Sequence, residues 1–210
     1  ICIPKSPDIM KRMQSVFDVR VNPKALLSPS ALNCYLDCPL KFYYKYVAGL
    51  AAPEEVSAEI DSAKFGSIFH YAAEHIYKEL TAHGKVINKD TLEALLQEEV
   101  KLQNYVDNGF KELFFHLPTD ERPEYNGVQL INSAVILRYI QQLLRNDLRH
   151  APFTFVGSEQ RVMEDVEIQT PKGAIRSRMG GIIDRMDSKD NVLRIVDYKT
   201  GGKADTPPSV

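Results

Sequence analysis

The chain lacks a long apolar run, a secretory leader and a disulfide framework. No apolar stretch in its 210 residues approaches the roughly 20 residues that span a bilayer, and no charged-then-apolar segment opens it. Its cysteines are three, an odd number that forms no even set of disulfides: Cys2, Cys34 and Cys38. We therefore expect a cytoplasmic protein with reduced thiols and no membrane partner.

An excess of positive charge and an ATP-binding loop are also missing. Twenty-six Lys and Arg residues against 28 Asp and Glu residues give a net charge of −2, so the chain cannot hold nucleic acid by overall charge. Any contact with DNA must be local, metal-assisted or supplied by a partner. No GxxxxGK[ST] sequence occurs, which places any ATP-driven motor outside these residues. Because the chain opens at Ile1 and closes in a Pro-rich tail, we expect a piece of a larger protein.

What the chain does contain is a pattern near its end. Residues 180–200 hold two apolar runs separated by the polar segment 188–191, which predicts a β-hairpin. We expect a tight turn around Lys189-Asp190, which would set Asp184 opposite Ile195 and one diagonal step, roughly 7–8 Å, from Asp197. Strand alternation then groups seven side chains on one face: Ile182, Asp184, Met186, Leu193, Ile195, Asp197 and Lys199.

Three ionisable groups on an apolar face predict a metal site, because burying unpaired charge is costly. Carboxylate oxygens are hard ligands that suit Mg²⁺ or Mn²⁺, and such a cation would offset the repulsion between Asp184 and Asp197. Lys199 lies on the same face and can reach a water or a phosphate oxygen. An alternative is a structural salt-bridge network with Lys199 and Arg185 in a plain interaction domain. Arg185 and Asp187 belong to the opposite face, where we expect solvent exposure or a cross-strand pair.

Two motifs in the hairpin, GIIDRMD at 181–187 and VDYKTG at 196–201, match a known pattern. Together they resemble the PD-(D/E)xK nuclease superfamily, in its RecB-like exonuclease branch with AddB-type relatives, whose members are domains of helicase–exonuclease proteins. The resemblance implies an α/β (α+β) fold with a restriction-endonuclease-like core. Its mixed sheet would be built on an antiparallel three-stranded meander and flanked by an N-terminal helical region. A further helix and a last strand would follow residue 210.

The sequence FGSIFHYAAE at 65–74 places His70 beside the apolar stripe of a predicted helix. From the residues alone, His70 is a core histidine or a partner of Glu74. It resembles, however, the metal-binding histidine of the family's first motif. The resemblance assigns the metal to His70, Asp184, Asp197 and the backbone carbonyl of Tyr198, makes Lys199 catalytic, and offers Glu159 as an outer or second ligand. The alternative for Glu159 is a solvent-facing strand residue.

By resemblance, the activity is that of a Mg²⁺- or Mn²⁺-dependent DNA exonuclease acting in recombination or repair as part of a helicase–nuclease. DNA and a helicase subunit or domain are the implied partners. Phosphodiester hydrolysis needs an activated water, a neutralised phosphate and stabilisation of the leaving oxygen, which metal ions and a lysine can supply. The alternative is a catalytically inactive module that keeps the nuclease fold for a structural or DNA-guiding role.

The rest of the chain divides into a lead-in at 1–27, a helical part at 28–150 and the nuclease meander at 151–210. Ser28 followed by Pro29 predicts a helix start, and Pro39 should interrupt that helix before a second one ends at Val47. Apolar periodicity predicts helices at 62–83, 88–115 and 128–148. A strand from Phe153 should return, after a turn at 171–173, as a second strand at 174–187.

Aromatic residues alternate with lysines at 41–46, either as an amphipathic helix with its rings inward or as a stacking surface for single strands. Cys34 and Cys38 are one helical turn apart and, from the sequence alone, are small buried residues. Cys38 also matches a cysteine that joins an iron–sulfur cluster in some AddB-type relatives. The other three cluster cysteines would lie past residue 210, so a cluster could form only in a longer parent chain.

Overall fold

The computed structural model describes residues 3–4, 6–51, 59–118, 121, 123–170 and 173–201. Cys2, Pro171, Lys172 and the tail after Gly201 lie outside the described residues. The chain divides into two compact units, one of Ile1–Glu55 with Arg161–Ile182 and the other of Val56–Gln160 with Ile183–Val210. The predicted metal ligands and Lys199 all belong to the second unit.

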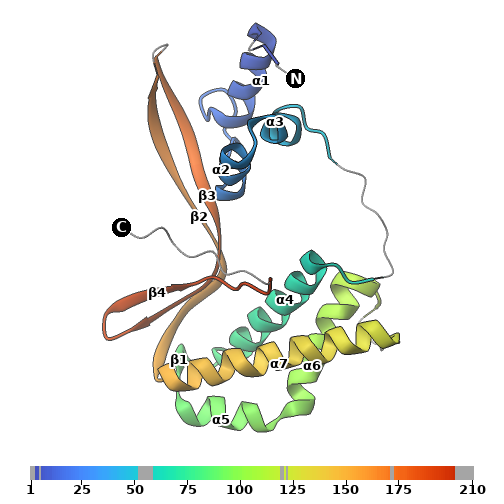
Figure 1. Ribbon diagram of the computed structural model, residues 1–210. Coiled ribbons are helices and arrows are strands. Elements are labelled where there is room, and N and C mark those ends of the chain that lie inside the picture. Colours follow the sequence, from blue (N-terminus) through green and yellow to red (C-terminus); the bar gives the residue numbers. More distant parts are fainter. Residues whose placement is uncertain are drawn as a thin grey trace. The chain divides into compact units, whose positions relative to one another are not determined.

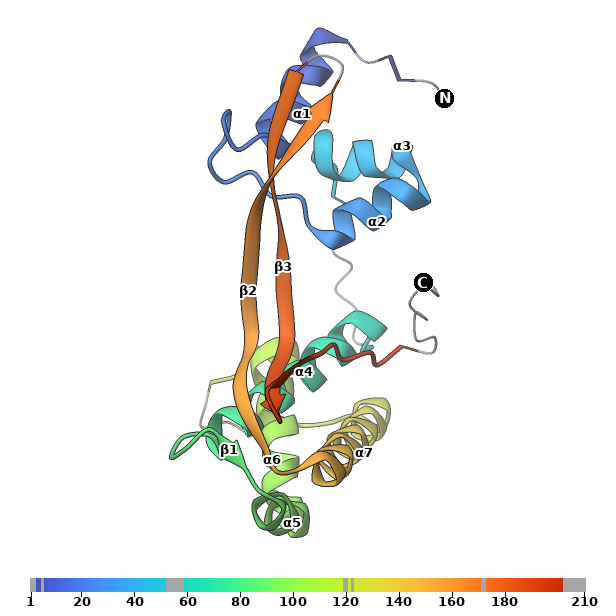
Figure 2. The same ribbon diagram turned by 90° about the vertical axis from the view of Figure 1, so that its left-hand side faces the viewer.

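Four strands form one sheet in the order β1-β2-β3-β4. They are β1 (Val86–Ile87), β2 (Phe153–Thr170), β3 (Gly173–Lys189) and β4 (Val192–Val196). The long strands β2 and β3 lie side by side in both views (Figures 1 and 2). The expected meander is confirmed as β2-β3-β4, and the two-residue β1 was not expected. The predicted mixed sheet is wrong for the described residues, because β1 pairs antiparallel with β2 and β3 antiparallel with β4, and the parallel contact there is the isolated bridge between Leu27 and Met179.

The hairpin is confirmed, but its predicted register is wrong by two residues. Met186, and not Asp184, lies opposite Ile195, and the loop consists of Asp190 and Asn191. Both loop residues have positive φ, 51° and 62°, as a two-residue turn of the right twist requires. Asp and Asn tolerate this backbone better than Ser or Lys do, which explains the position of the turn. A shift of two residues preserves strand alternation, so the predicted division into two faces survives.

The expected burial of the two hairpin faces is reversed. Leu193 and Ile195, on the face of Asp184, are 56% and 62% exposed. On the opposite face, Arg185 and Asp187 are 1% and 0% exposed. The inference that charges interrupt a buried apolar face is therefore wrong, and so is the expected solvent exposure of Arg185 and Asp187. The other expectation for these two residues, a cross-strand pair, is confirmed because Asp187 faces and binds Arg194.

Helices form most of the second unit: α4 (Ser62–Leu80), α5 (Lys89–Gln97), α6 (Glu99–Phe110), the π-helical turn η2 (Lys111–Phe115) and α7 (Gly127–His150). Local capping explains two starts, because Asp61 accepts from the Lys64 amide and Asn126 forms a capping box with Gln129. The single helix expected over 88–115 is interrupted at Glu98, where ψ is 61°. No proline or glycine marks this break; α5 and α6 bury separate apolar stripes against the other helices.

A continuous apolar core joins these helices to the strands. It includes Ile68, Phe69 and Ile76 from α4, and residues of α6, α7 and β2 pack around them. Helix α4 contacts both α6 and α7, in agreement with Figure 1. No helix among the described residues is sufficiently long and apolar to span a bilayer.

The first unit contains α1 (Pro7–Phe17), α2 (Pro29–Asp37), α3 (Pro39–Phe42) and the π-helical turn η1 (Tyr43–Val47). The predicted start at Ser28 is confirmed, since its hydroxyl accepts from the Ala31 amide. Phe42 points inward and stacks on Phe17, which favours the packing role of this segment over a stacking surface. Cys34 and Cys38 are free thiols and are partly exposed, so the expectation of buried cysteines is wrong.

Candidate metal centre

His70 lies on helix α4, and its imidazole is close to Glu159 of β2 and Asp184 of β3. The helix approaches the segment after β4 closely at Gly66, where an added Cβ would lie 3.3 Å from the Thr200 hydroxyl oxygen. The imidazole of His70 is 28% exposed and makes edge contacts with the rings of Phe69 and Tyr198. Because residue 66, one turn before His70, is glycine, the helix that carries His70 can pack closely against the segment that follows β4.

Strand β2 delivers Glu159 to the same place through a distorted backbone. Glu159 has φ of +48°, a left-handed conformation that costs of order 1–3 kcal/mol for a residue other than glycine. Its carboxylate lies 3.4 Å from Nδ1 of His70 and is 32% exposed. A strained strand residue aimed at a histidine is characteristic of functional sites, and the solvent-facing alternative for Glu159 does not describe this position.

Strand β3 contributes Asp184, the most buried member of the group. Its side chain is 12% exposed, and Oδ1 lies 3.7 Å from Nδ1 of His70. Its other oxygen accepts a hydrogen bond of 2.6 Å from the Tyr198 amide. One ligand atom from each of His70, Glu159 and Asp184 lies within 4.8 Å of the others. Glu74 binds Lys78, and among the described residues no hydrogen bond or ion pair joins it to His70.

The donor set of this group fits a divalent cation. It offers one imidazole nitrogen and two carboxylate oxygens, which suit Mg²⁺ or Mn²⁺. Two carboxylates in a half-buried position repel one another, and a cation between them would remove that repulsion. All three residues were predicted from the sequence as ligands.

The other predicted residues are not in this group. Asp197 and Lys199 form an ion pair of 2.6 Å with each other, and their side chains are 61% and 56% exposed. Continuing the hairpin register would pair Asp184 with Asp197, but β4 ends at Val196. Tyr198 touches the centre through its amide and its ring. Of the alternative salt-bridge network, the pair of Asp197 with Lys199 is present, whereas Arg185 binds Asp147 and Asp187.

An open hollow of about 620 Å³ adjoins the centre. Small residues of α4 line it, among them Ala63, Gly66 and Ser67, and it ends at His70 and Glu159. This hollow provides space for a substrate beside the candidate ligands.

Behind the centre lies a buried ionic cluster that the sequence analysis did not find. Arg185 donates to both oxygens of Asp147, at 2.6 and 2.8 Å, and Arg194 donates to both oxygens of Asp187, at 2.8 and 2.7 Å. Tyr77 donates to Asp147 as well. A signal for Asp147 existed: it is an acidic residue in the last turn of α7, where the helix dipole disfavours negative charge.

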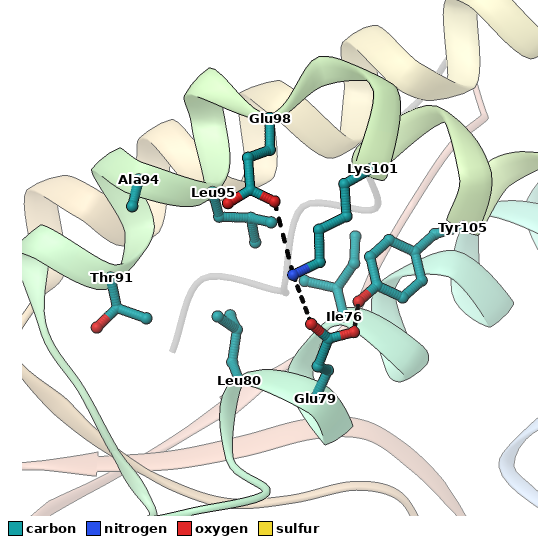
Figure 3. A pocket seen from close by; sticks show the side chains of 9 residues that line it. All are labelled: Ile76, Glu79, Leu80, Thr91, Ala94, Leu95, Glu98, Lys101 and Tyr105. Atoms are coloured by element: carbon teal, nitrogen blue, oxygen red, sulfur yellow. Dashed lines mark hydrogen bonds and ion pairs between the residues drawn. The ribbon is translucent and has the colours of Figure 1, made fainter.

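A smaller hollow of about 260 Å³ lies between α4, α5 and α6 (Figure 3). In it, Lys101 forms ion pairs with Glu79 at 2.6 Å and with Glu98 at 3.7 Å, and Tyr105 donates to Glu79 (Figure 3). The ammonium of Lys101 is held between the two glutamates, and no residue of the two sequence motifs lines the hollow. We therefore assign the chemistry to the His70 centre.

Comparison with known proteins identifies the family of the chain. The family model of the PD-(D/E)XK nuclease superfamily matches residues 26–209. The chain is similar to the B-type subunit of the ATP-dependent helicase/deoxyribonuclease of Carboxydothermus hydrogenoformans, with 28% identity over 188 residues. It is also similar to the corresponding helicase/deoxyribonuclease proteins of Clostridium perfringens, with 24% identity over 192 residues, and Leuconostoc mesenteroides, with 25% over 201 residues.

These matches cover 85%, 86% and 91% of this chain, but only 16% of each relative. The chain therefore corresponds to about a sixth of the length of these proteins. Because the family model covers most of the chain and includes both motifs of the metal centre, the chain belongs to the PD-(D/E)XK nuclease superfamily.

Proposed function

We propose that this chain is the nuclease domain of a helicase–nuclease protein and hydrolyses phosphodiester bonds of DNA with Mg²⁺ or Mn²⁺. The observation that carries this function is the convergence of His70, Glu159 and Asp184, whose ligand atoms lie within 4.8 Å of one another. The similarity to ATP-dependent helicase/deoxyribonuclease proteins supports DNA as the substrate and a helicase as the partner. Exonuclease action in recombination or repair, and a cytoplasmic location, are part of the proposal.

In this proposal His70, Glu159 and Asp184 hold the cation, and Asp197 and the Tyr198 carbonyl are additional ligands. The bound cation would neutralise the phosphate and supply an activated water near neutral pH. Asp197 binds Lys199 on the surface, where an ion pair is worth only about 0–1 kcal/mol and is easily exchanged.

Lys199 is the proposed catalytic cation. Its ammonium group would stabilise the negative charge that grows on the phosphate as the water oxygen bonds to phosphorus and the bond to the leaving oxygen breaks. The ion pair with Asp197 holds the lysine side chain beside another proposed ligand. The adjoining hollow along α4, which His70 and Glu159 help to line, leaves room for the nucleotide.

The exposed ion pair also favours a second candidate, a nuclease-fold module without catalysis. With Asp197 and Lys199 bound to each other, the group of three could hold a cation for structure or for DNA guidance alone. Metal binding is common to both candidates, and cleavage of DNA separates them.

Titration of the chain with Mn²⁺ by calorimetry tests the metal centre. The unaltered chain should bind the ion, and Asp184→Asn should lower its affinity at least about 10-fold because a charged ligand is lost. Asp190→Asn is a matched control in the same hairpin, at a turn position that Asn tolerates. Equal affinity in Asp184→Asn and the unaltered chain, or no binding to either, contradicts the metal centre.

Digestion of end-labelled DNA, single- and double-stranded, in Mn²⁺ or Mg²⁺ then decides between the two candidates. Shortening of the DNA from one end by the unaltered chain, and not by Asp184→Asn, supports an exonuclease. Intact DNA at saturating metal supports the inactive module.

A further inference from the structure

We propose that Tyr198 and Arg185 are positioning residues: Tyr198 holds two ligands of the metal centre, and the buried cluster around Arg185 fixes Tyr198. This inference rests on the proposed metal centre and adds the device that keeps the centre in shape before a cation binds.

Tyr198 contacts two metal-ligand candidates that come from different elements. Its backbone amide donates to Asp184 of β3 at 2.6 Å. Its ring meets the imidazole of His70 on α4 edge-on, with 5.5 Å between the ring centroids, and meets Phe69 in the same manner. One residue therefore sets both the orientation of a carboxylate and the position of an imidazole, which is how outer residues tune metal ligands.

Tyr198 itself follows the end of β4 and lies outside the ladder that β4 forms with β3, so strand pairing does not fix it. Its ring is held by contacts with other side chains, among them Arg185, whose guanidinium carbon lies 5.9 Å from the ring centroid. Burial raises the pKa of the Tyr198 phenol, although the positive charge of Arg185 acts in the opposite direction. Among the described residues the phenol oxygen makes no hydrogen bond of normal geometry, and the Arg185 side chain interacts with it closely enough to act on its pKa.

Arg185 is a rigid anchor for that ring. Its side chain is 1% exposed, is held by both oxygens of Asp147, and has its guanidinium 4.4 Å from the centroid of the Tyr77 ring. Asp147 and Asp187 carry two negative charges and Arg185 and Arg194 two positive ones, so the cluster is neutral as a whole. The planar guanidinium fork loses less side-chain entropy for each hydrogen bond than a lysine ammonium does, which suits a fixed support.

Metal-ligand candidates and positioning residues are also neighbours in the sequence. Asp184 faces the metal centre, and Arg185, the next residue of β3, faces the cluster; Tyr198 bridges the two sides from the other motif. The two motifs therefore interleave ligands with the residues that position them.

The test is Mn²⁺ affinity of the full 210-residue chain, measured by calorimetry, beside the melting temperature of each variant. Tyr198→Leu removes the ring from His70 and should weaken Mn²⁺ binding roughly 10- to 100-fold. Tyr198→Phe keeps the ring that contacts His70, so it should bind Mn²⁺ more tightly than Tyr198→Leu does. The matched control is Tyr139→Leu, which removes a similar edge contact with Phe65 on the same helix α4, outside the metal centre.

Affinity lowered in Tyr198→Leu and unchanged in Tyr139→Leu supports the positioning role, with the melting temperatures showing that both variants fold. Unchanged affinity in Tyr198→Leu overturns it while leaving the metal centre intact. Should Tyr198→Leu fail to fold, Arg185→Lys decides, because it keeps the charge and loses the two-point hold on Asp147: lowered affinity supports the role and unchanged affinity overturns it. Absence of Mn²⁺ binding to the unaltered chain would overturn the proposed function together with this inference.

Discussion

The Arg185 guanidinium binds both carboxylate oxygens of Asp147, at 2.6 and 2.8 Å, inside the second unit. The two residues join the last turn of α7 to the middle of the hairpin that carries the nuclease motifs. Neither carboxylate of the cluster, Asp147 or Asp187, is more than 2% exposed, so each depends on its arginine partners for compensation. This dependence makes Arg185 the residue of the hairpin to which stability should be most sensitive.

We expect Arg185→Met to lower the free energy of unfolding by about 3–5 kcal/mol, because it leaves buried carboxylates without their main partner. Urea denaturation followed by far-ultraviolet circular dichroism measures this, since the chain contains no tryptophan for fluorescence. The control is Arg176→Met, whose arginine is 57% exposed and lies 3.7 Å from Asp165, and which should change stability little. Equal stability of Arg185→Met and the unaltered chain would contradict the structural role of the cluster.

Glu159 gives a second prediction, because its backbone and its side chain have separable effects. Glycine adopts a φ of +48° without strain, so Glu159→Gly should keep the stability of the chain or raise it by up to about 1 kcal/mol. The same variant should lower Mn²⁺ affinity at least about 10-fold, since a carboxylate of the centre is gone. Thermal melting and calorimetry on one sample measure both quantities.

Two further variants at this position separate the causes. Glu159→Gln keeps the backbone strain and removes the charge, so only the Mn²⁺ affinity should fall. Glu159→Val places a β-branched residue at positive φ and should lower the melting temperature as well. A lower melting temperature in Glu159→Gly than in Glu159→Gln would show that strain at this residue is not what limits stability.

Much of this arrangement could be predicted because its signals are local. The cap at Ser28 and the division of the hairpin into two faces depend on a few neighbouring residues, and the structure has both. His70 and Asp184 are predicted as metal ligands because of their motifs, and Glu159 as an outer or second ligand because of its order in the chain; the three lie together.

The failures concern tertiary packing. The burial of one hairpin face depends on its contacts with Asp147 and Tyr77. Both residues lie far from the hairpin in the sequence, and neither belongs to a recognisable motif. The break at Glu98 likewise depends on how α5 and α6 pack, and not on a breaking residue. The position of the turn was predictable in principle, since Asp190-Asn191 is the better pair for positive φ.

The turn provides a third prediction. Asn191 has a φ of +62°, so Asn191→Gly should raise the free energy of unfolding by up to about 1 kcal/mol, as an Asp-Gly pair suits a two-residue hairpin loop. Asn191→Val should lower it, because a β-branched residue resists this backbone. Both variants are far from the metal ligands in the hairpin and should bind Mn²⁺ as the unaltered chain does. A stabilising Asn191→Val would contradict the observed turn.

Lys199 gives the last prediction, which separates binding from catalysis. Lys199→Ala removes the partner that Asp197 has at 2.6 Å, so the freed carboxylate should leave Mn²⁺ affinity unchanged or slightly higher. Cleavage should nevertheless fall about 10²- to 10³-fold, because the charge that stabilises the transition state is lost.

Asp197→Asn should instead lower both affinity and cleavage, as expected of a ligand. The measurements are Mn²⁺ calorimetry and the rate of DNA digestion at saturating metal, so that a change in affinity is not mistaken for a change in rate. Full cleavage by Lys199→Ala would exclude the lysine from catalysis, and full Mn²⁺ affinity in Asp197→Asn would confine the ligand set to the three residues that already lie together.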